Sequence, residues 1–374
     1  MTTPLLATPI TLRGLTIANR VWMSPMCQYA APATGPDVGC PGPHHLTHYA
    51  ARAQGGVGLI IVEATAICPS GRISAFDLGL WDDHQIPAHA ALVAAIHAAG
   101  AKACLQLGHA GRKAGTPPRW GSDRPAPQAP ARVGPSPVPF SLTLGTPRAL
   151  TPTEIAQLPQ QFAAATRRAL AAGYDSVEIH AAHGYLLQSF LSPLSNHRTD
   201  QWGGDFTGRT RVVLDTVDAV RAALPTQAPL LLRISATDWV HENDPATPAW
   251  TSADTVALAP LLAARGVDLL DCSAGGATPT FPPSATSHDG YQRHLARAVA
   301  HTDTTPRLAV GAVGRLNSAA LAEEVLTSGD ADVVLVGRKL LADPYLPHRW
   351  TTQLGGEPRW PAPYTGAIPA AWLD

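Results

Sequence analysis

The feature that most constrains the fold of this chain is an alternation of short apolar runs with Ala-rich segments of helical spacing. Near-continuous apolar strands that alternate with amphipathic helices predict a parallel sheet with a covered outer face. Eight such units close a barrel, so we expect an α/β fold of the (β/α)8 TIM-barrel type. The apolar runs occupy residues 20–26, 57–63, 101–107, 174–179, 229–234, 267–272, 306–310 and 331–336. Helical segments are expected at 84–99, 152–172, 209–224, 253–265 and 318–327.

Glycines support several of these boundaries. Gly100, Gly173, Gly266 and Gly329 each stand between a helical segment and the apolar run that follows it. Glycine readily takes the left-handed conformation in which many helices end. No G-x-G-x-x-G fingerprint follows the first run, which weighs against a doubly wound dinucleotide-binding sheet.

One long connection, from the third apolar run to the helical segment at 152, departs from the alternation of strands and helices. It holds part of the chain's 36 Pro and 32 Gly residues. Long connections in compact domains are usually functional lids or disordered insertions. We expect one domain over 1–374, with residues 108–150 as a lid over the barrel mouth and 345–374 as a C-terminal tail. A disordered insertion is the alternative for the long loop.

Composition excludes some partners and compartments. The chain has 27 Lys and Arg against 28 Asp and Glu, which gives no basic field for nucleic acid or an anionic membrane. Five cysteines without a CxxC pair argue against a disulfide framework and a thiolate zinc site. No signal peptide or transmembrane run is evident, so we expect a cytoplasmic protein.

Polar residues and glycines collect where the expected strands end, which is where barrel enzymes place their chemistry. Loops after the seventh and eighth strands of this fold commonly hold a phosphate. Gly311, Gly314 and Gly337 allow close backbone approach there, and Arg338 offers a bidentate donor, although ordinary turn glycines remain the alternative. The other polar strand ends are Ser24, Glu63, Thr65, Gln106, His180, His183, Arg233 and Ser273.

Histidines and a cysteine admit several interpretations. His180 and His183 could be a metal pair, two donors to a substrate oxygen, or structural residues, and Glu63 is the one candidate third ligand nearby. The cluster His44, His45 and His48 lacks the HExxH pattern, so we expect no metal site. Cys27 and Tyr29 would share one face of an extended segment. A buried thiol is usually inert, but beside a conjugated cofactor it could tune electronic properties.

Several motifs together resemble the old yellow enzymes, and the cysteine with the His-x-x-His pair resembles their thermophilic-like ene-reductase branch. The resemblance covers about residues 5–344. The motifs are S-P-M-C-Q-Y at 24–29, E-A-T at 63–65, Q-L-G-H-A-G-R-K at 106–113, H-A-A-H-G-Y-L at 180–186, S-N-H-R-T-D-Q-W-G-G at 195–204 and V-G-R at 336–338.

The resemblance implies an FMN-dependent NAD(P)H oxidoreductase that reduces activated C=C bonds in enones, enals or maleimides through a ping-pong cycle, with NADPH or NADH as donor. It implies that Gly314, Gly337 and Arg338 hold the FMN phosphate. Gln106 would pair with the pyrimidine edge of the flavin, and Ala64 would leave room beside the ring. It further implies a homodimer or homotetramer with small-molecule partners.

The resemblance also assigns roles around the flavin. Arg233 would lie near N1 and O2, where negative charge gathers on reduction, and Ser24, Pro25, Met26 and Cys27 would lie along the N5 and O4 side. His180 and His183 would bind the substrate carbonyl. Tyr185 would protonate the α-carbon, Tyr29 would contact the substrate or shape the pocket, and the Cys27 thiol would modulate the reduction potential.

The sequence departs from that branch in two places. No arginine follows Arg359, where the branch commonly has one that reaches into a neighbouring subunit, although Trp372 could supply an aromatic contact. Residues 39–44 lack the tryptophan usual before the first histidine. Two alternatives therefore stay open: a metal-dependent barrel hydrolase that uses His180, His183 and the histidines at 44–48, and an FMN-binding barrel without catalysis.

Overall fold

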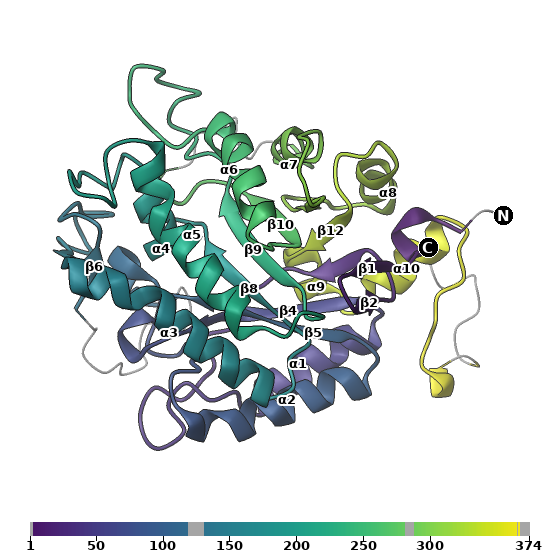
Figure 1. The fold of residues 1–374 in the computed structure, drawn as a ribbon. Coiled ribbons are helices and arrows are strands. Elements are labelled where there is room, and N and C mark those ends of the chain that lie inside the picture. Colours follow the sequence, from purple (N-terminus) through teal and green to yellow (C-terminus); the bar gives the residue numbers. More distant parts are fainter. Residues whose placement is uncertain (1–2, 119–130, 281–287, 365, 367–374) are drawn as a thin grey trace.

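The computed structural model describes residues 3–118, 131–280, 288–364 and 366. In this part of the chain, eight parallel strands close into a barrel, which confirms the predicted (β/α)8 TIM barrel (Figure 1). All eight lie inside or next to the apolar runs expected from the sequence. In chain order they are β3 (Val21–Met23), β4 (Leu59–Ala66), β5 (Lys102–Gly108), β8 (Ser176–Ala181), β9 (Leu230–Ser235), β10 (Leu269–Ser273), β11 (Ala309–Ala312) and β12 (Val333–Val336).

Helices surround the barrel, and the five expected helical segments are all present (Figure 1). They are α2 (Ile86–Ala98), α3 (Pro152–Ala171), α5 (Phe206–Ala223), α6 (Ser252–Ala264) and α8 (Ala319–Thr327). Side chains fix several starts: Thr151 and Glu154 form a capping box on α3, and Thr251 and Asp254 form one on α6. Helix α5 begins three residues earlier than expected, because the Asp205 carboxylate accepts a hydrogen bond from the Gly208 amide.

Other elements have weak sequence signals and are not in the expected set. An antiparallel hairpin of β1 (Ile10–Leu12) and β2 (Leu15–Ile17) packs against Trp22 in the cluster inside the barrel. The remaining helices of at least five residues are α1 (Pro43–Gln54), α4 (Leu186–Leu191), α7 (Arg293–Ala300), α9 (Arg338–Ala342) and α10 (Leu346–Gln353). None of the described helices has the length and apolarity that crossing a bilayer requires.

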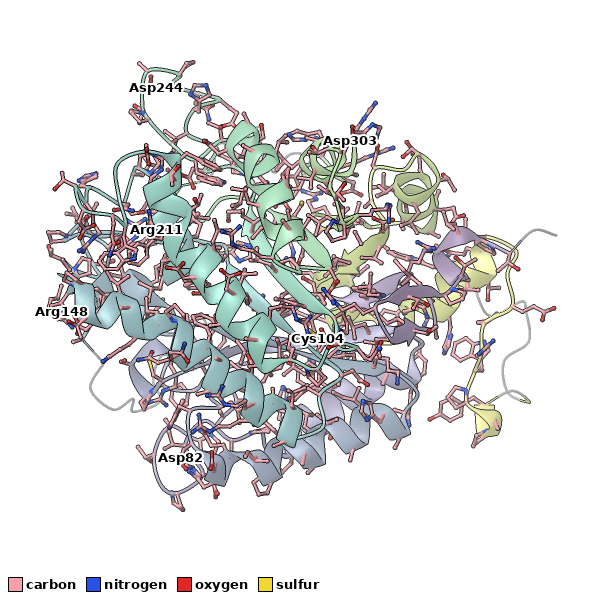
Figure 2. All side chains as sticks on the ribbon, viewed as in Figure 1. Asp82, Cys104, Arg148, Arg211, Asp244 and Asp303 are labelled. Atoms are coloured by element: carbon pink, nitrogen blue, oxygen red, sulfur yellow. The ribbon has the colours of Figure 1, made fainter. Side chains whose placement is uncertain are left out.

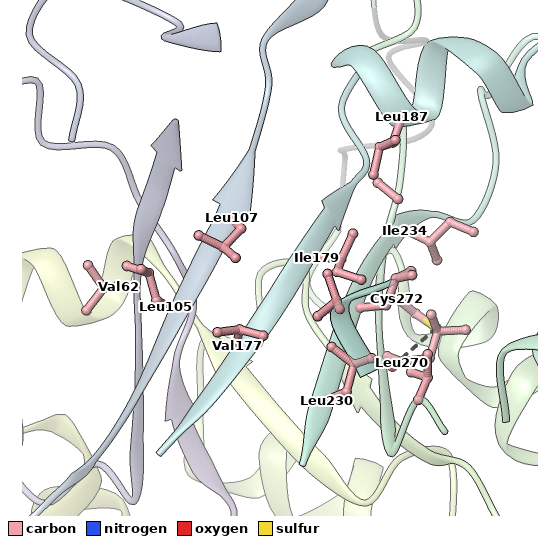
Figure 3. Packing of buried hydrophobic residues seen from close by; sticks show 14 of the residues in the cluster. Val62, Leu105, Leu107, Val177, Ile179, Leu187, Leu230, Ile234, Leu270 and Cys272 are labelled. Atoms are coloured by element: carbon pink, nitrogen blue, oxygen red, sulfur yellow. Dashed lines mark hydrogen bonds between the residues drawn. The ribbon is translucent and has the colours of Figure 1, made fainter. Parts of the chain in front are cut away.

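The strands alternate their side chains between two cores. Outward residues such as Val62, Leu105, Val177, Leu230 and Leu270 pack under the helices (Figure 3). Inward residues of the same strands form a smaller cluster inside the barrel, where Cys104 lies, whereas Asp82, Arg148, Asp244 and Asp303 are exposed at the periphery (Figure 2). Because side chains alternate with a period of two, each strand can supply apolar residues to the outer core and polar ones to the interior.

The inward side chains change character along the barrel axis. Near the N-terminal ends of the strands they are apolar, as at Leu59, Cys104 and Leu231. Two residues further along β5 and β9 they are Gln106 and Arg233, both buried. The barrel is therefore closed by hydrophobic packing at one end and opens through a polar layer towards the C-terminal ends of its strands.

The long loop after β5 contains the 3-10 turn η4 (Gly111–Lys113) and a short parallel pair, β6 (Val133–Gly134) with β7 (Arg148–Ala149). Residues 119–130, in the middle of the expected lid, lie outside the described part of the chain. After α10 the tail continues to the turn η6 (Ala362–Tyr364), and Trp360 packs against His348 and Tyr345. Trp372 also lies outside the described residues.

Candidate active site

A cavity of about 670 Å³ opens at the C-terminal ends of β3 and β9–β12. That volume is within the range of small-molecule and cofactor sites. Nine of the residues singled out from the sequence line it: Ser24, Pro25, Met26, His183, Arg233, Ser273, Gly314, Gly337 and Arg338. They come from loops and strands far apart in the sequence, and the barrel brings them together.

The innermost wall of the cavity is formed by Arg233 on β9. Its side chain is nearly buried, and its Nε lies 3.0 Å from Asp271 Oδ2 on the neighbouring strand β10. Gln106 lies in the same layer but does not line the cavity. Its Nε2 donates a hydrogen bond of 2.8 Å to Glu178 Oε1. A fixed guanidinium at this position favours negative charge on a group bound above it.

His180 and His183 lie side by side, with ring centroids 5.2 Å apart in an edge-on arrangement. His180 Nδ1 accepts a hydrogen bond from the Ala182 amide, so a neutral His180 carries its proton on Nε2. His183 Nε2 lies 2.7 Å from Ser273 Oγ. Burial, with the nearby Arg233 charge, holds the pKa of both imidazoles well below the usual value. Both are therefore neutral hydrogen-bonding groups.

A second, smaller pocket adjoins these histidines. Ala64, His180 and Tyr185 line it, and Cys27 and Tyr29 belong to the apolar cluster beside it. The expected extended segment from Cys27 to Tyr29 is wrong in detail, because Tyr29 has a φ of +53° and turns the chain. The two side chains nevertheless pack in one cluster with Ala64 and Tyr185.

The hydroxyl and thiol at this pocket are protonated groups. Burial raises the pKa of the Tyr185 phenol well above its usual value, and neighbouring Cys27 and Tyr29 add to the effect. Burial likewise raises the pKa of the Cys27 thiol, with further contributions from Asp77 and Glu63. Tyr185 can therefore donate a proton, whereas Cys27 is not a thiolate nucleophile.

The far end of the cavity is built from backbone and flexible cations. Gly314 has a φ of +114°, and a Cβ there would come within 3.0 Å of Gln292 Cβ. A Cβ on Gly337 would meet only Met26 Sδ, at 3.4 Å. Arg338 and Lys339 are exposed and line this end of the cavity. Glycine backbone that lines a cavity beside two cations is suited to binding a phosphate.

Lys113, in the loop after β5, contacts the backbone of the loop that carries His183. Its Nζ donates to the His183 carbonyl at 2.7 Å and lies 4.3 Å from the Phe140 ring centroid and 5.0 Å from that of Tyr185. Burial, and the neighbouring Arg112 charge, lower the pKa of Lys113 to about 8. Lys113 belongs to the motif at 106–113, but the sequence predicts no role for it.

Other site residues were missed by sequence reasoning. Ser273 was noted as a strand end, yet only the folded chain shows that it meets His183. Asp77 lines the smaller pocket from a loop, where strand ends give no signal, and His109, which follows the end of β5, lines it too, although the sequence predicts no role for it. Tyr291, Gln292, Arg315, Leu316 and Asn317 line the cavity from segments that flank β11.

Glu63 and the histidines of α1 serve a structural purpose. Glu63 is fully buried, and its Oε2 accepts the Gln28 amide at 2.6 Å, which fixes the loop after β3. Its Oε1 lies 3.3 Å from both Tyr49 Oη and His45 Nε2. Within the described residues, no group of three or more His, Cys, Asp or Glu side chains could hold a metal ion.

The residues present fit a flavin mononucleotide. The cavity joins a buried guanidinium at Arg233 to an exposed end with Arg338, and its length between them is bordered by Ser24, Pro25 and Met26. A planar ring system needs such a partly apolar wall, and a phosphate needs such a cationic, glycine-bearing end. The donor set is therefore appropriate to both parts of the cofactor.

Comparison with known proteins agrees with this geometry. Residues 5–357 match the sequence profile of the NADH:flavin oxidoreductase / NADH oxidase family. An NADPH dehydrogenase of Bacillus licheniformis is 42% identical over 368 residues, covering 97% of this chain and 98% of that protein. These matches confirm the resemblance inferred from the motifs.

Solved structures show the same fold. An old yellow enzyme homologue from Zymomonas mobilis superposes with a TM-score of 0.76 at 26% identity, covering 99% of both chains. A 2-naphthoyl-CoA reductase complex gives a TM-score of 0.82 at 25% identity over 94% of this chain, which spans about half (52%) of that larger chain. The chain therefore belongs to the NADH:flavin oxidoreductase / NADH oxidase family and is an FMN-dependent oxidoreductase with a nicotinamide nucleotide as electron donor.

Proposed function

We propose that this oxidoreductase is an ene-reductase, which reduces the C=C bond of an enone, enal or maleimide. Bound FMN supplies the site that takes a hydride from NADPH or NADH and delivers it to the β-carbon of the alkene. Because one cavity serves both partners, the donor must leave before the alkene binds. The expected kinetics are therefore ping-pong. A barrel that binds FMN without catalysis is the outcome that the experiment below would expose.

The observation that carries this proposal is the grouping of two neutral hydrogen-bonding side chains: His183 lines the cavity, and His180 lines the smaller pocket beside it. His180 directs its Nε2 proton away from the Ala182 amide, and His183 lies 5.2 Å from it. Two such groups can bind the carbonyl oxygen of an activated alkene and stabilise the negative charge that develops there. A single preorganised donor of this kind is worth about 10²–10³ in rate.

Tyr185 is the proposed source of the proton for the α-carbon. Its ring centroid lies 5.0 Å from that of His180, so the phenol and the carbonyl-binding groups are neighbours. The raised pKa keeps the phenol protonated at neutral pH. The Lys113 ammonium beside the ring would stabilise the phenolate left after transfer. Tyr29, in the adjoining apolar cluster, would shape the space for the substrate.

The FMN contacts are proposed residue by residue. Arg233 would lie under the pyrimidine ring, and Gln106 would reach its edge from beneath the cavity wall. Gly314, Gly337 and Arg338 would hold the phosphate. Ser24, Pro25, Met26 and Cys27 would border one side of the ring, with Ala64 leaving room beside it.

The wider organisation is also a proposal. We infer one domain, with residues 108–150 as a lid over the cavity and a homodimer or homotetramer as the assembled state. Lys113 and Phe140 support the lid, because both come from this loop: Lys113 donates to the His183 carbonyl, and Phe140 packs against Lys113. All five cysteines are free, which suits a reducing cytosol.

Steady-state kinetics test the proposed reaction. NADPH and NADH oxidation would be followed with 2-cyclohexenone, cinnamaldehyde and N-ethylmaleimide, and with cyclohexanone as the saturated control. We expect turnover with the alkenes, formation of the saturated carbonyl product, and parallel double-reciprocal lines. Oxidation that is unaffected by any alkene, with no saturated product, would contradict the proposal.

A further inference from the structure

A buried polar layer lies beneath the cavity and is not explained by the reaction as proposed. It consists of inward side chains from four adjacent strands: Gln106, Glu178, Arg233 and Asp271. Gln106 is the register partner of Glu178, and Asp271 is that of Arg233. Glu178 and Asp271 have no solvent exposure, and Arg233 is 5% exposed. The layer is therefore a buried cluster with one face, at Arg233, open to the cavity.

Charge and hydrogen bonds do not balance in this layer if every group is ionised. Two carboxylates would share one guanidinium. Arg233 Nε lies 3.0 Å from Asp271 Oδ2 but is not aligned for a hydrogen bond. Glu178 Oε1 accepts from Gln106, whereas Glu178 Oε2 and both Asp271 oxygens have no hydrogen-bond partner among the described residues. An unpaired, unsolvated carboxylate is strongly disfavoured.

We propose that Glu178 and Asp271 hold a single proton between them, and that this carboxyl pair sets how strongly Arg233 attracts negative charge in the cavity. With one proton on the pair, one carboxylate balances one guanidinium and the layer is neutral. Both acids act through Arg233, so they are positioning residues. The second half of the inference rests on the proposed placement of the flavin over Arg233, and the first half does not.

The acid strengths of the two carboxyls agree with one retained proton. Burial raises the pKa of Glu178 to about 8, and the Asp271 charge adds to that effect while Arg233 opposes it. Burial raises the pKa of Asp271 to about 6, again opposed by Arg233. Near pH 7 the two groups together therefore keep one proton and titrate as a pair.

The other titratable groups that face this layer carry no charge near pH 7. Burial raises the pKa of the Cys104 thiol on β5 and of the Cys272 thiol on β10. The imidazoles of His180 and His183, above the layer, have a lowered pKa for the reasons already given. Arg233 is thus the cation that the pair must balance.

The consequence for the cofactor follows from the charge of the layer. When reduction places negative charge above Arg233, the pair should retain its proton to a higher pH. Above about pH 8 the unreduced protein loses that proton, so reduction there takes up one additional proton from solvent. For each pH unit in this range, the equilibrium constant for reduction of the flavin would then fall by up to a further factor of ten. This corresponds to a drop of about 30 mV in the reduction potential of a two-electron couple.

Infrared spectroscopy tests the shared proton without reference to where the flavin lies. In difference spectra at pH 7, the FMN-loaded wild type should show the C=O stretch of one more buried protonated carboxyl than the variants, in addition to any band from Asp77, whose pKa burial raises to about 7. Glu178→Gln should remove this additional band, and so should Asp271→Asn, because the remaining acid then ionises against Arg233. Loss in both single variants is the expected result. Absence of the additional band from the wild type, or its persistence in both variants, would overturn the inference.

Reduction potentials test the link to the cofactor. At pH 7 each single variant keeps one carboxylate. We therefore expect its equilibrium constant for flavin reduction to stay within about threefold of the wild-type value, which is a change of about 15 mV in the reduction potential. The double variant leaves the positive charge of Arg233 without a carboxylate to balance it. Its equilibrium constant for flavin reduction should therefore rise at least tenfold, which raises the reduction potential by about 30 mV. Two single shifts that sum to the double shift would contradict a shared proton. Asp175→Asn, at the residue that precedes β8, is the matched control.

A second readout covers the case in which the double variant does not fold. Glu178→Gln keeps the oxygen that accepts from Gln106, and it should abolish the extra pH dependence of the potential above about pH 8. Potentials identical in all variants, with the infrared pattern as expected, would show that the flavin does not lie over Arg233. That result would overturn the link to the cofactor and the proposed flavin placement, and it would leave the shared proton standing.

Discussion

At the scale of single residues, His183 is held in a conformation that few residues other than glycine adopt. Its φ is +60°, which costs free energy that the surrounding contacts must offset. The His183 amide donates to Ser235 Oγ at 2.8 Å, and its carbonyl accepts from Lys113. These two backbone contacts hold His183 in the conformation in which its imidazole lines the cavity, and they give Lys113 a role in positioning it.

Replacing the His183 side chain tests its role as a substrate donor. We expect His183→Ala to keep FMN bound, because the backbone contacts remain, but to lower kcat/KM for enones by about 10²–10³ and to weaken phenolic ligands. Ser273→Ala is the variant for comparison. It removes the hydroxyl group that contacts His183 Nε2 and leaves the imidazole itself in place. Unchanged enone kinetics in His183→Ala would show that this imidazole does not bind substrate.

The Cys27 thiol offers a contrasting prediction. Because its pKa is raised by burial, we expect no covalent role, so Cys27→Ala should keep turnover within about tenfold while shifting the flavin potential. Potentiometry and steady-state rates on the same preparation check both parts. Complete loss of turnover, with FMN still bound, would mean that the thiol takes part in the chemistry.

At the scale of elements, the ends of β11 and β12 form the proposed phosphate site. The sequence located this site because short apolar strands followed by glycines have a strong pattern. Arg338→Ala should raise the Kd for FMN by about 10- to 100-fold, the cost of a lost charge-assisted contact. The Kd of Arg338→Lys for FMN should lie between those of the wild type and Arg338→Ala, since lysine keeps the positive charge but lacks the planar guanidinium.

The matched control for that measurement is Arg307→Ala, since Arg307 is exposed and absent from the cavity wall. Its Kd for FMN should equal that of the wild type. Equal Kd values for Arg338→Ala and wild type, measured by fluorescence quenching on reconstituted apoprotein, would remove Arg338 from the phosphate site.

Helix α2 is attached to its neighbours through a buried histidine, which gives a pH-dependent prediction. His89 Nε2 donates to the Gly79 carbonyl at 3.1 Å, and its Nδ1 lies 2.9 Å from Tyr174 Oη. Burial lowers the pKa of His89 to about 4, below the unfolded value of about 6.5. The unfolded chain therefore binds a proton that the folded chain does not, and stability is lost as pH falls below about 6.5.

Denaturant unfolding at two pH values measures this contribution. His89→Gln should be less stable than the wild type at pH 7, and that deficit should shrink by about 2 kcal/mol at pH 5. His241→Gln, at an exposed position, is the control and should show no such change. A deficit that stays constant between the two pH values would argue against a neutral buried His89.

At the scale of the whole molecule, the barrel was predictable and its surroundings were less so. The eight strands have strong signals, because each is a continuous apolar run buried on both faces. Helix α1 has no clear apolar pattern in the sequence, since its buried face holds His45, His48 and Tyr49 with only Ala53 as an aliphatic residue. The hairpin β1–β2 has three-residue strands, and such short elements depend on tertiary contacts that no local pattern encodes.

The same division applies to the site. Residues at strand ends, such as Arg233 and His183, could be found because the barrel topology dictates where strand ends meet. Asp77, Tyr291 and Gln292 reach the pockets from loops, so their positions depend on how those loops pack over the barrel. Glu178 and Asp271 lie inside strands, and only the register shows that Glu178 is paired with Gln106 and Asp271 with Arg233.

The central claim is that one FMN at the mouth of this barrel is reduced by a nicotinamide nucleotide and reoxidised by an activated alkene. Anaerobic stopped-flow mixing tests it most directly. NADPH should bleach the visible flavin band, and 2-cyclohexenone added afterwards to the reduced protein, without oxygen, should restore it with formation of cyclohexanone. A band that bleaches with NADPH but is not restored by any enone, enal or maleimide would contradict the account.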